Sequence, residues 1–479
     1  MPRTSDFIRL ALVTIFALSL GTGCTKAAKK ERYQTQAEND FKAGSYDKAK
    51  IEYLNVLRFD PQNAPAFKRL GQMWMEEGAP LKAGAFLVKA SELEPNDLEN
   101  RLRLARTYQA VGRHDQAKKE VLFVLQHSPD DGEALLLLSE IALTPEEIAS
   151  AEQALQKSTK KSAASQLAAA NLAIRKSDLK TAGTAIARAL ELEPKSPRAH
   201  QSAGILALLQ QDQKRAGAEF KTAAELSPAR SNLKTVYPEY LLKTGATDQA
   251  KQYLQGLTSK TPDFLPAWIL QARIALAAKN YGQTLALLEN VISRDSDNLD
   301  ARVLQANSWL AKNETAKAVS ALERLNSSYP GAPALKVELA KAYIQSGKFP
   351  QAAAVLQEAV TASPNYADAV LLLSEINLRN GQAGPAITAL EGLLKTRPDI
   401  VKAQTLLADA YRAAGRLDDS AAVFRQQIAR TPEKPEPYFF LGVVQRQQNK
   451  TADARQSFNK ALELAPDSAE TLTQLVELD

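Results

Sequence analysis

Small, apolar and turn-forming residues recur along the chain with a period of 34 positions. Gly44, Gly78 and Gly112 are one period apart, and prolines continue the same spacing along most of the chain. The prolines in this spacing are Pro61, Pro95, Pro129, Pro194, Pro228, Pro262, Pro330, Pro364, Pro398, Pro432 and Pro466. One interval, Pro129 to Pro194, is 65 residues and therefore three short of two periods. Such regularity is the signature of a repeat architecture.

Each period predicts two helices that cross closely. Its eighth position is small, as at Ala37 and Gly71, and so is its twentieth, as at Ala182 and Ala216. A larger residue there would overpack the crossing, at about 1–3 kcal/mol. A glycine at the fifteenth position suits the turn between the helices, and the proline at the thirty-second ends the second helix.

The repeat resembles a known helical family. Residues 67–74, FKRLGQMW, followed by Ala83 and Pro95, resemble the tetratricopeptide signature of an aromatic residue, Leu-Gly, a second aromatic residue, Ala and Pro. The resemblance covers about nine-tenths of the chain and implies an all-α, right-handed superhelical solenoid. It would contain about thirteen helix-turn-helix repeats and a final half repeat at 469–479.

Two repeats depart from the pattern. The fourth is three residues short and enters its second helix through Thr144-Pro145-Glu146-Glu147, which reads as a helix cap, a first-turn proline and a capping-box glutamate. In the seventh, Pro238 occupies the small position of the first helix. Proline there would break a mid-helix hydrogen bond or begin a shortened helix. We therefore predict a kink that divides the superhelix into two segments.

The N-terminus reads as an export signal. Arg3 and Arg9 precede the apolar run 10–20, and Cys24, the only cysteine, follows small residues. The segment resembles a bacterial lipoprotein signal, which implies lipid attachment at Cys24. The resemblance also implies the outer membrane, because Thr25 and not Asp follows the cysteine. A lone unmodified thiol would be a liability in an oxidising compartment. Since Gly21 departs from the family preference, an ordinary signal that leaves a soluble periplasmic protein is the alternative.

These features predict four segments. They are a signal peptide at 1–23, a lipidated basic tether at 24–32, repeats 1–6 at 33–230, and repeats 7–13 with the final half repeat at 231–479. The chain stops one helix into a new repeat, and that helix is either a cap or the start of further sequence.

The charge distribution argues against nucleic acid as a partner. The formal net charge is +6, of which residues 1–23 carry +1 and residues 26–32 carry +3, which leaves +2 for the other residues. Lys and Arg there are interspersed with Asp and Glu, which is typical of a solvated surface. The basic tether beside Cys24 would add about 1 kcal/mol per charge at an anionic membrane.

The sequence predicts no enzyme, no cofactor and no metal site. His114, His127 and His200 occupy repeat positions that other repeats fill with packing residues. The segment 295–300, DSDNLD, begins like a calcium loop but lacks its glycine and its bidentate glutamate. The chain also has no glycine-rich phosphate loop.

The candidate site is the groove that the family lines with its first helices. In repeats 8 to 11 the fifth and twelfth positions of that helix are apolar and the ninth is polar, which suits an extended segment or an amphipathic helix of a partner protein. The apolar positions are Ile269, Leu276, Val303, Leu310, Val337, Ile344, Leu371 and Leu378. The polar positions are Arg273, Asn307, Lys341 and Glu375. The alternative is that the apolar residues pack against the next helix.

Together these features predict a lipid-anchored, non-catalytic scaffold that binds proteins on the periplasmic side of the outer membrane. The opening YDKAKIEYLNVLRFDP, residues 46–61, resembles repeat lipoproteins associated with exopolysaccharide production and PEP-CTERM protein sorting. One alternative is an assembly factor for a secretion system, a pilus or an outer-membrane complex. Another is the repeat portion of a glycosyltransferase-type enzyme, if the chain continues past Asp479.

Overall fold

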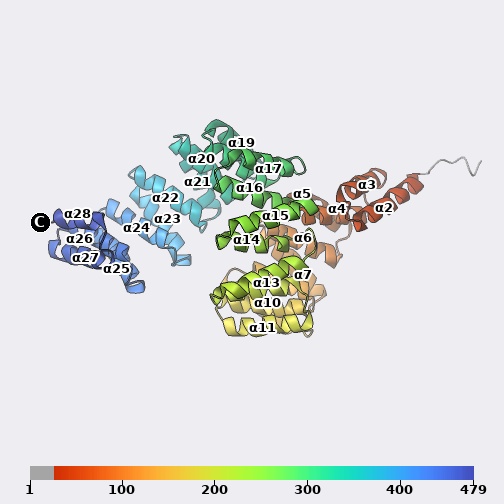
Figure 1. Ribbon diagram of the computed structural model, residues 1–479, viewed down its shortest axis with the longest axis horizontal. Coiled ribbons are helices and arrows are strands. Elements are labelled where there is room, and N and C mark those ends of the chain that lie inside the picture. Colours follow the sequence, from red (N-terminus) through yellow and green to blue (C-terminus); the bar gives the residue numbers. More distant parts are fainter. Residues whose placement is uncertain (1–25, 479) are drawn as a thin grey trace, which may run out of the picture. The chain divides into compact units, whose positions relative to one another are not determined.

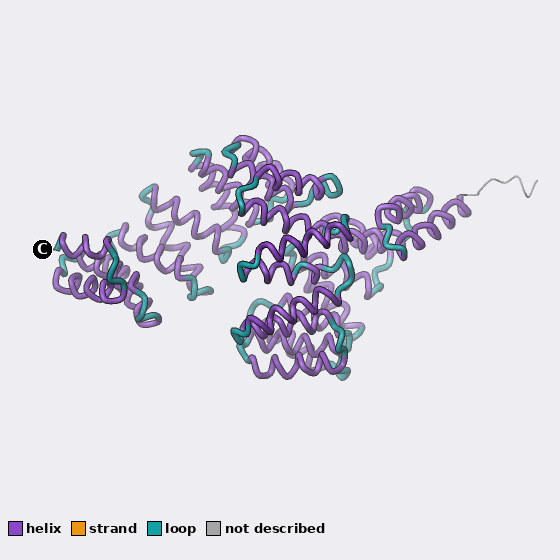
Figure 2. The backbone as a smooth tube through the Cα atoms, in the orientation of Figure 1, coloured by secondary structure: helices purple, strands orange, loops and turns teal. Residues whose placement is uncertain are grey.

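The computed structural model describes residues 26–478 and is helical throughout (Figures 1 and 2). Within this range it contains 27 α-helices, α2 to α28, one 3-10 helix and no strand. None of the described helices is both long enough and apolar enough to cross a bilayer. The predicted all-α fold of helix pairs is confirmed, whereas the predicted signal and Cys24 lie outside the described residues.

The described chain forms two compact units. The first runs to Ala278 and includes Ala286–Asn298, and the second comprises Lys279–Leu285 and the residues from Leu299 onward, so α17 is divided between them. The helices up to α16 are α2 (Lys26–Lys42), α3 (Tyr46–Phe59), α4 (Ala64–Glu77), α5 (Pro80–Leu93), α6 (Leu98–Ala110), α7 (His114–His127), α8 (Gly132–Ile141), α9 (Pro145–Lys157), α10 (Ala163–Arg175), α11 (Leu179–Leu192), α12 (Pro197–Leu209), α13 (Gln213–Leu226), η1 (Asn232–Lys234), α14 (Val236–Lys243), α15 (Thr247–Lys260) and α16 (Leu265–Ala277).

The remaining helices continue the alternation. They are α17 (Tyr281–Ile292), α18 (Leu299–Ala311), α19 (Thr315–Ser328), α20 (Pro333–Gln345), α21 (Phe349–Ala362), α22 (Ala367–Arg379), α23 (Ala383–Thr396), α24 (Val401–Ala413), α25 (Leu417–Arg430), α26 (Pro435–Gln447), α27 (Thr451–Leu464) and α28 (Ala469–Val476). In each repeat a first helix, A, packs against a second helix, B, and then against helix A of the next repeat, as α20 does with α21 and α22.

The close helix crossings lie where the sequence places small residues. A side-chain carbon added to Gly71 would lie 2.5 Å from Leu87, and one added to Gly204 would lie 2.8 Å from the Phe220 ring. Because an L side chain cannot fit at such distances, the large residue of helix B occupies the space that the glycine of helix A leaves. The pairing of small and large residues therefore fixes how the two helices cross.

The turn between helices A and B requires a left-handed backbone at the fifteenth repeat position. Gly347 has φ +73° there, but other repeats use residues with a side chain, such as Lys279 at φ +59° and Asn313 at φ +63°. A non-glycine residue pays a small conformational cost in this region, and the surrounding helix pair over-determines the turn. The packing therefore enforces the turn even where the sequence lacks the glycine.

The short fourth repeat has the predicted helix entry. Its helix A, α8, has 10 residues instead of the usual 13 or 14. Thr144 caps α9 by accepting from the Glu147 backbone N–H at 3.3 Å, and Glu147 accepts from the Thr144 N–H at 3.2 Å. The capping box and the first-turn proline are therefore confirmed.

Asp130 ties the turn before α8 to the segment that follows α9. Its carboxylate accepts from the backbone N–H of Lys160 at 3.2 Å, the Ser158 hydroxyl at 2.9 Å and the Thr159 N–H at 2.6 Å. Hydrogen bonds to the ionised form, that of Lys160 first, lower the pKa of Asp130 to about 2. The carboxylate therefore joins the turn before α8 to the segment 158–160 after α9.

Asp130→Asn is expected to destabilise the first unit at pH 6, and the difference from the parent chain should shrink with acidification. A carboxyl whose folded pKa is depressed stabilises the protein above its unfolded pKa of about 3.9 and loses that effect as pH falls toward the folded value. Urea unfolding midpoints of both chains between about pH 6 and pH 2.5 measure this window. An equal difference at every pH would show that ionisation of the Asp130 carboxyl does not cause the loss of stability.

Pro238 lies in the first turn of a shortened helix, which is one of the two outcomes that the sequence left open. The 3-10 helix η1 ends before Thr235, and α14 has eight residues with Pro238 in its first turn. Proline is tolerated in a first turn because the N–H it lacks would have no partner within the helix. Residues 231–278 belong to the first compact unit.

Candidate partner-binding surface

The apolar positions of the predicted groove lie largely within the core between helices. In α16, Ile269 is 6% exposed. In the second unit, Val337 is 3% and Leu371 9% exposed, and Leu310 is also buried. The other four positions, Leu276, Val303, Ile344 and Leu378, are half-buried. Packing against neighbouring helices therefore occupies most of this apolar surface, and its contact with a partner stays a prediction.

The polar positions between them are the more accessible part of helix A. Arg273 and Lys341 are exposed, and Asn307 and Glu375 are half-buried. The Lys341 ammonium lies 2.7 Å from Glu338 within α20. The Glu375 carboxylate lies 2.8 Å from the Lys402 ammonium and joins α22 to α24. In the second unit, Asn307, Lys341 and Glu375 thus form a polar line along successive A helices that a partner can reach.

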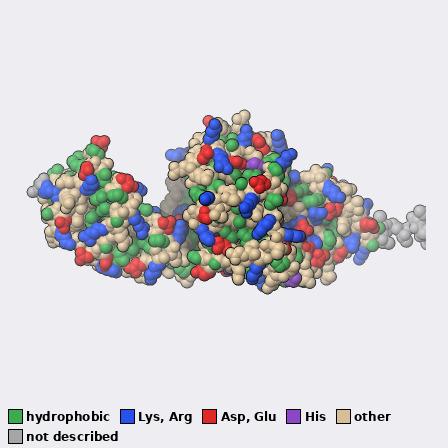
Figure 3. Space-filling view, turned by 90° about the horizontal axis from the view of Figure 1, so that it is seen from below, with side chains coloured by type: hydrophobic (Ala, Val, Ile, Leu, Met, Phe, Trp, Pro, Cys, Tyr) green, Lys and Arg blue, Asp and Glu red, His purple; other side chains and the backbone are tan. Residues whose placement is uncertain are grey.

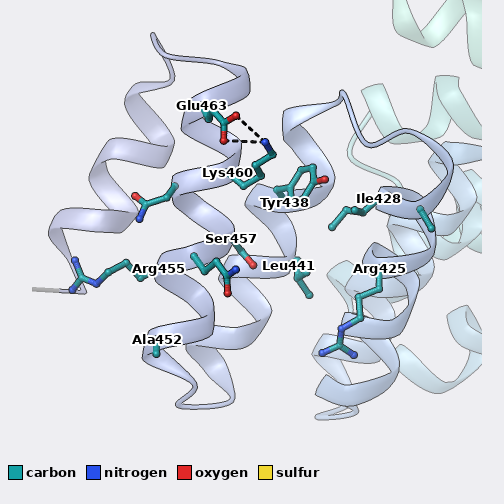
Figure 4. A pocket seen from close by; sticks show the side chains of 12 residues that line it. Arg425, Ile428, Tyr438, Leu441, Ala452, Arg455, Ser457, Lys460 and Glu463 are labelled. Atoms are coloured by element: carbon teal, nitrogen blue, oxygen red, sulfur yellow. Dashed lines mark hydrogen bonds and ion pairs between the residues drawn. The ribbon is translucent and has the colours of Figure 1, made fainter.

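A groove of about 800 Å³ lies among α25, α26 and α27 of the second unit (Figure 4). Leu441 and Ser457 lie at its centre, and Arg425 and Lys460 stand on opposite sides. The Lys460 ammonium lies 2.8 Å from the Glu463 carboxylate. One repeat earlier, α23, α24 and α25 enclose an equivalent groove of about 450 Å³. Sequence reasoning missed these grooves because the architecture recurs in each repeat and no distinctive motif marks it.

The three histidines make local contacts. His127 Nδ1 lies 2.9 Å from the Phe123 carbonyl oxygen in the same helix. His200 Nδ1 lies 2.7 Å from Glu219, and His114 opens α7. Among the residues that the structure describes, no group of three or more His, Cys, Asp and Glu side chains could hold a metal ion.

Charged side chains of both signs are interspersed on the face shown in Figure 3. Ion pairs join many charged side chains of the described residues, for example Lys312 with Glu314 at 2.6 Å and Arg416 with Asp419 at 2.7 Å. Exposed pairs of this kind contribute only about 0–1 kcal/mol each. The visible face therefore has the mixed-charge surface that the sequence predicts.

The stacked helix pairs define a repeat protein that presents long surfaces made by several repeats. Two family models described as tetratricopeptide repeat match the chain. The first matches residues 102–165, 167–231 and 405–469, and the second matches 75–122, 275–336, 310–358 and 343–410. Together these segments cover well over half of the chain, which therefore belongs to the tetratricopeptide-repeat proteins. Arrays of this family are typically scaffolds that bind proteins or peptides.

Each of the related proteins below is similar to this chain over only part of its own length. Superkiller complex protein 3 of Mus musculus is 27% identical over 141 residues, which are 28% of this chain and 9% of that protein. DnaJ homolog subfamily C member 3 of Gallus gallus is 23% identical over 145 residues, 30% of this chain and 29% of that protein. These segments show shared repeats and span less than a third of either relative.

Solved structures include similar helical arrays. The Cut9-Hcn1 hetero-tetramer structure matches with a TM-score of 0.41 and 14% identity over 94% of this chain and 97% of that chain. Yeast Tom70 matches with a TM-score of 0.39 and 14% identity over 95% of this chain and 96% of that chain. YrrB, described as a tetratricopeptide protein with an unusual peptide-binding site, matches with a TM-score of 0.34 and 16% identity over 39% of this chain and 96% of that chain.

Proposed function

We propose that this chain is a non-catalytic scaffold of the bacterial cell envelope that binds protein segments along its A helices and is anchored by a lipid at Cys24. The observation that carries the binding function is the tetratricopeptide array, which extends from α2 to α28. A repeat array offers a long surface to an extended partner, because each repeat adds a similar row of side chains.

The accessible polar line makes the partner contact in this proposal. In the second unit, Asn307, Lys341 and Glu375 recur on successive A helices, and half-buried Val303, Ile344 and Leu378 flank them. Arg273 holds the same helix position in the first unit. Side chains of both signs favour a partner segment that carries complementary charges along its length.

The export pattern and the lone cysteine support the anchor. Residues 10–20 are apolar, Cys24 follows them, and no other cysteine occurs in the sequence. Lipidation would place the array on the periplasmic side of the outer membrane, and the resemblance of residues 46–61 to exopolysaccharide- and sorting-associated lipoproteins suggests the pathway. A single acyl chain binds membranes only marginally, so several chains and the basic tether would act together.

Cys24→Ser is expected to abolish incorporation of an alkyne-bearing fatty acid into the chain and to move it from the membrane fraction to the soluble fraction. Metabolic labelling of cells followed by fractionation measures both outcomes. Thr25→Ser is the matched control, because it changes a neighbouring hydroxyl residue and keeps the thiol. Labelling that persists in Cys24→Ser would contradict the anchor and leave the binding function untouched.

Photocrosslinking tests the binding surface without disturbing the core. A photoreactive amino acid at position 341 on α20 is expected to capture a defined envelope protein in intact cells, and Glu375→Lys should weaken that capture several-fold. Arg324 on α19, which is also exposed, is the control position on a B helix. Equal capture from positions 341 and 324 would place the contact elsewhere.

A further inference from the structure

The first two repeats of the first unit contact loops that lie far along the sequence. Gly44 and Asp47 belong to repeat 1, and they meet Arg230 and Arg294, which are 186 and 247 residues further on. Lys82 of repeat 2 likewise meets the loop after α17. The chain thus returns to its own beginning within this unit.

Arg230 bridges the two sides of this contact. Its guanidinium donates to the Asp263 carboxylate at 2.6 and 2.9 Å, which joins the loops after α13 and α15. It also donates to the Gly44 carbonyl oxygen at 2.9 Å and lies 4.0 Å from the Tyr46 ring. A guanidinium has enough donors to satisfy both partners while it stacks on an aromatic face.

Two ion pairs cross the contact beside Arg230. The Arg294 guanidinium lies 3.0 Å from the Asp47 carboxylate. The Lys82 ammonium lies 3.1 Å from the Asp295 carboxylate and donates to the Arg294 carbonyl oxygen at 3.2 Å. The loops after α13 and α17 therefore supply charged groups to repeats 1 and 2, and Asp263 in the loop after α15 pairs with Arg230.

A glycine of repeat 2 lies close to the start of α16 beside these pairs. Gly78 has φ +86°, and a side-chain carbon added there would lie 2.5 Å from the ring of Pro266 at the start of α16. Trp74, in the same repeat, lies between the Lys50 ammonium at 4.0 Å and the Lys82 ammonium at 4.6 Å. The absence of a side chain at Gly78 thus leaves the space that the Pro266 ring occupies.

The apolar cores on the two sides are separate. One core runs from Ala37 to Met73 in repeats 1 and 2, and another from Leu241 to Ile274 in repeats 7 and 8. Ion pairs, the stacking of Arg230 on Tyr46, the hydrogen bond to the Gly44 carbonyl and the approach of Gly78 to Pro266 join the two sides. One carboxylate oxygen of Asp263 is buried without a hydrogen-bond partner among the described residues. Desolvation of such a charge offsets part of the attraction that the ion pairs contribute.

We propose that Asp47, Lys82, Arg230, Arg294 and Asp295 form an ionic clasp that closes the first unit reversibly. When the clasp is closed, repeats 1 and 2 are held against repeats 6 to 8. When it opens, the A helices of the repeats between them become more accessible to a partner, and this consequence rests on the proposed binding function. Salt opens the clasp because it screens partly exposed ion pairs far more than it affects apolar packing.

The distance between repeats 1 and 7 reports the clasp directly. Spin labels at Lys42→Cys and Lys260→Cys, two exposed positions, are introduced into the full chain that carries Cys24→Ser. Pulsed electron-spin measurements are expected to give one short distance at about 0.05 M salt and a longer or broader distribution at about 1 M salt. The double variant Lys82→Glu/Arg294→Glu places carboxylates opposite Asp295 and Asp47 and should give the long distribution at low salt.

Two further variants keep the test specific. Adding Asp47→Arg to the double variant restores one crossing ion pair and should recover part of the short distance. Lys251→Asp removes an exposed pair with Asp248 within α15 and should leave the distance unchanged. Circular dichroism confirms that each variant keeps its helices. An unchanged short distance in Lys82→Glu/Arg294→Glu, or a long distance in the parent at low salt, would overturn the clasp whether or not the chain binds a partner.

Discussion

Glu77→Ala is expected to destabilise the first unit by about 3 kcal/mol, the lower end of the range for breaking a buried ion pair. The Glu77 carboxylate is 1% exposed and accepts two hydrogen bonds at 2.8 Å from the Lys50 ammonium, which is 8% exposed. Burial raises the pKa of Glu77 even though Lys50 acts to lower it. Removal of the carboxylate leaves a buried ammonium whose other nearby carboxylate is the exposed Asp47, at 3.2 Å.

Urea unfolding followed by Trp74 fluorescence measures this loss, with Trp268 and Trp309 changed to Phe in every chain. The control is Lys50→Met/Glu77→Leu, which removes both charges and keeps the volume. Because apolar replacements of buried pairs are often neutral or stabilising, this variant should unfold near the parent midpoint. If the double variant is as unstable as Glu77→Ala, packing and not the unpaired charge is responsible.

Phe424→Ala is expected to destabilise the C-terminal repeats by about 3–5 kcal/mol, the range for truncating a buried phenylalanine. Phe424 lies in α25, is 2% exposed and packs with Ala408, Leu441 and Val444. Because a repeat array gains stability from contacts between neighbours, the loss should appear first in α24 to α27 and not along the whole chain.

Hydrogen exchange resolved along the sequence measures the loss helix by helix. Phe440→Ala is the matched control, because Phe440 stacks on Phe424 with ring centroids 5.5 Å apart but is 36% exposed. Its effect should be clearly smaller. Equal loss of protection in both variants, or loss spread evenly over all repeats, would contradict local unfolding of the C-terminal repeats.

The sequence predicted the local structure closely because the same residue types recur at the same positions of successive repeats. The small residue at the eighth position, the turn at the fifteenth and the proline at the thirty-second recur often enough to fix helix and turn boundaries. The sequence also indicated the local structure at two places where it departs from the repeat pattern. Thr144 and Glu147 predicted a capping box, and Pro238 predicted either a broken mid-helix hydrogen bond or the shortened helix that is found, because capping and proline chemistry depend only on neighbouring residues.

The candidate groove was less predictable. Helix position placed Arg273 and Lys341 in solvent as expected, but Ile269, Val337 and Leu371 are buried between helices. Apolar residues at these positions fit either packing between helices or binding of a partner, because both require the same residue types. Which of the two applies depends on how closely the next helix approaches, and that distance is set by residues on another repeat.

The sequence alone determined that the chain is an array of helix pairs, because every signal for that architecture lies within one period or the next. It also placed the small residues, the caps and the mixed surface charge. Only the tertiary structure decided where the chain meets itself. The contacts of Gly44 with Arg230 and of Asp47 with Arg294 join residues 186 and 247 positions apart, and the curvature summed over many repeats brings them together. A sequence pattern within one repeat does not predict the total curvature of many repeats.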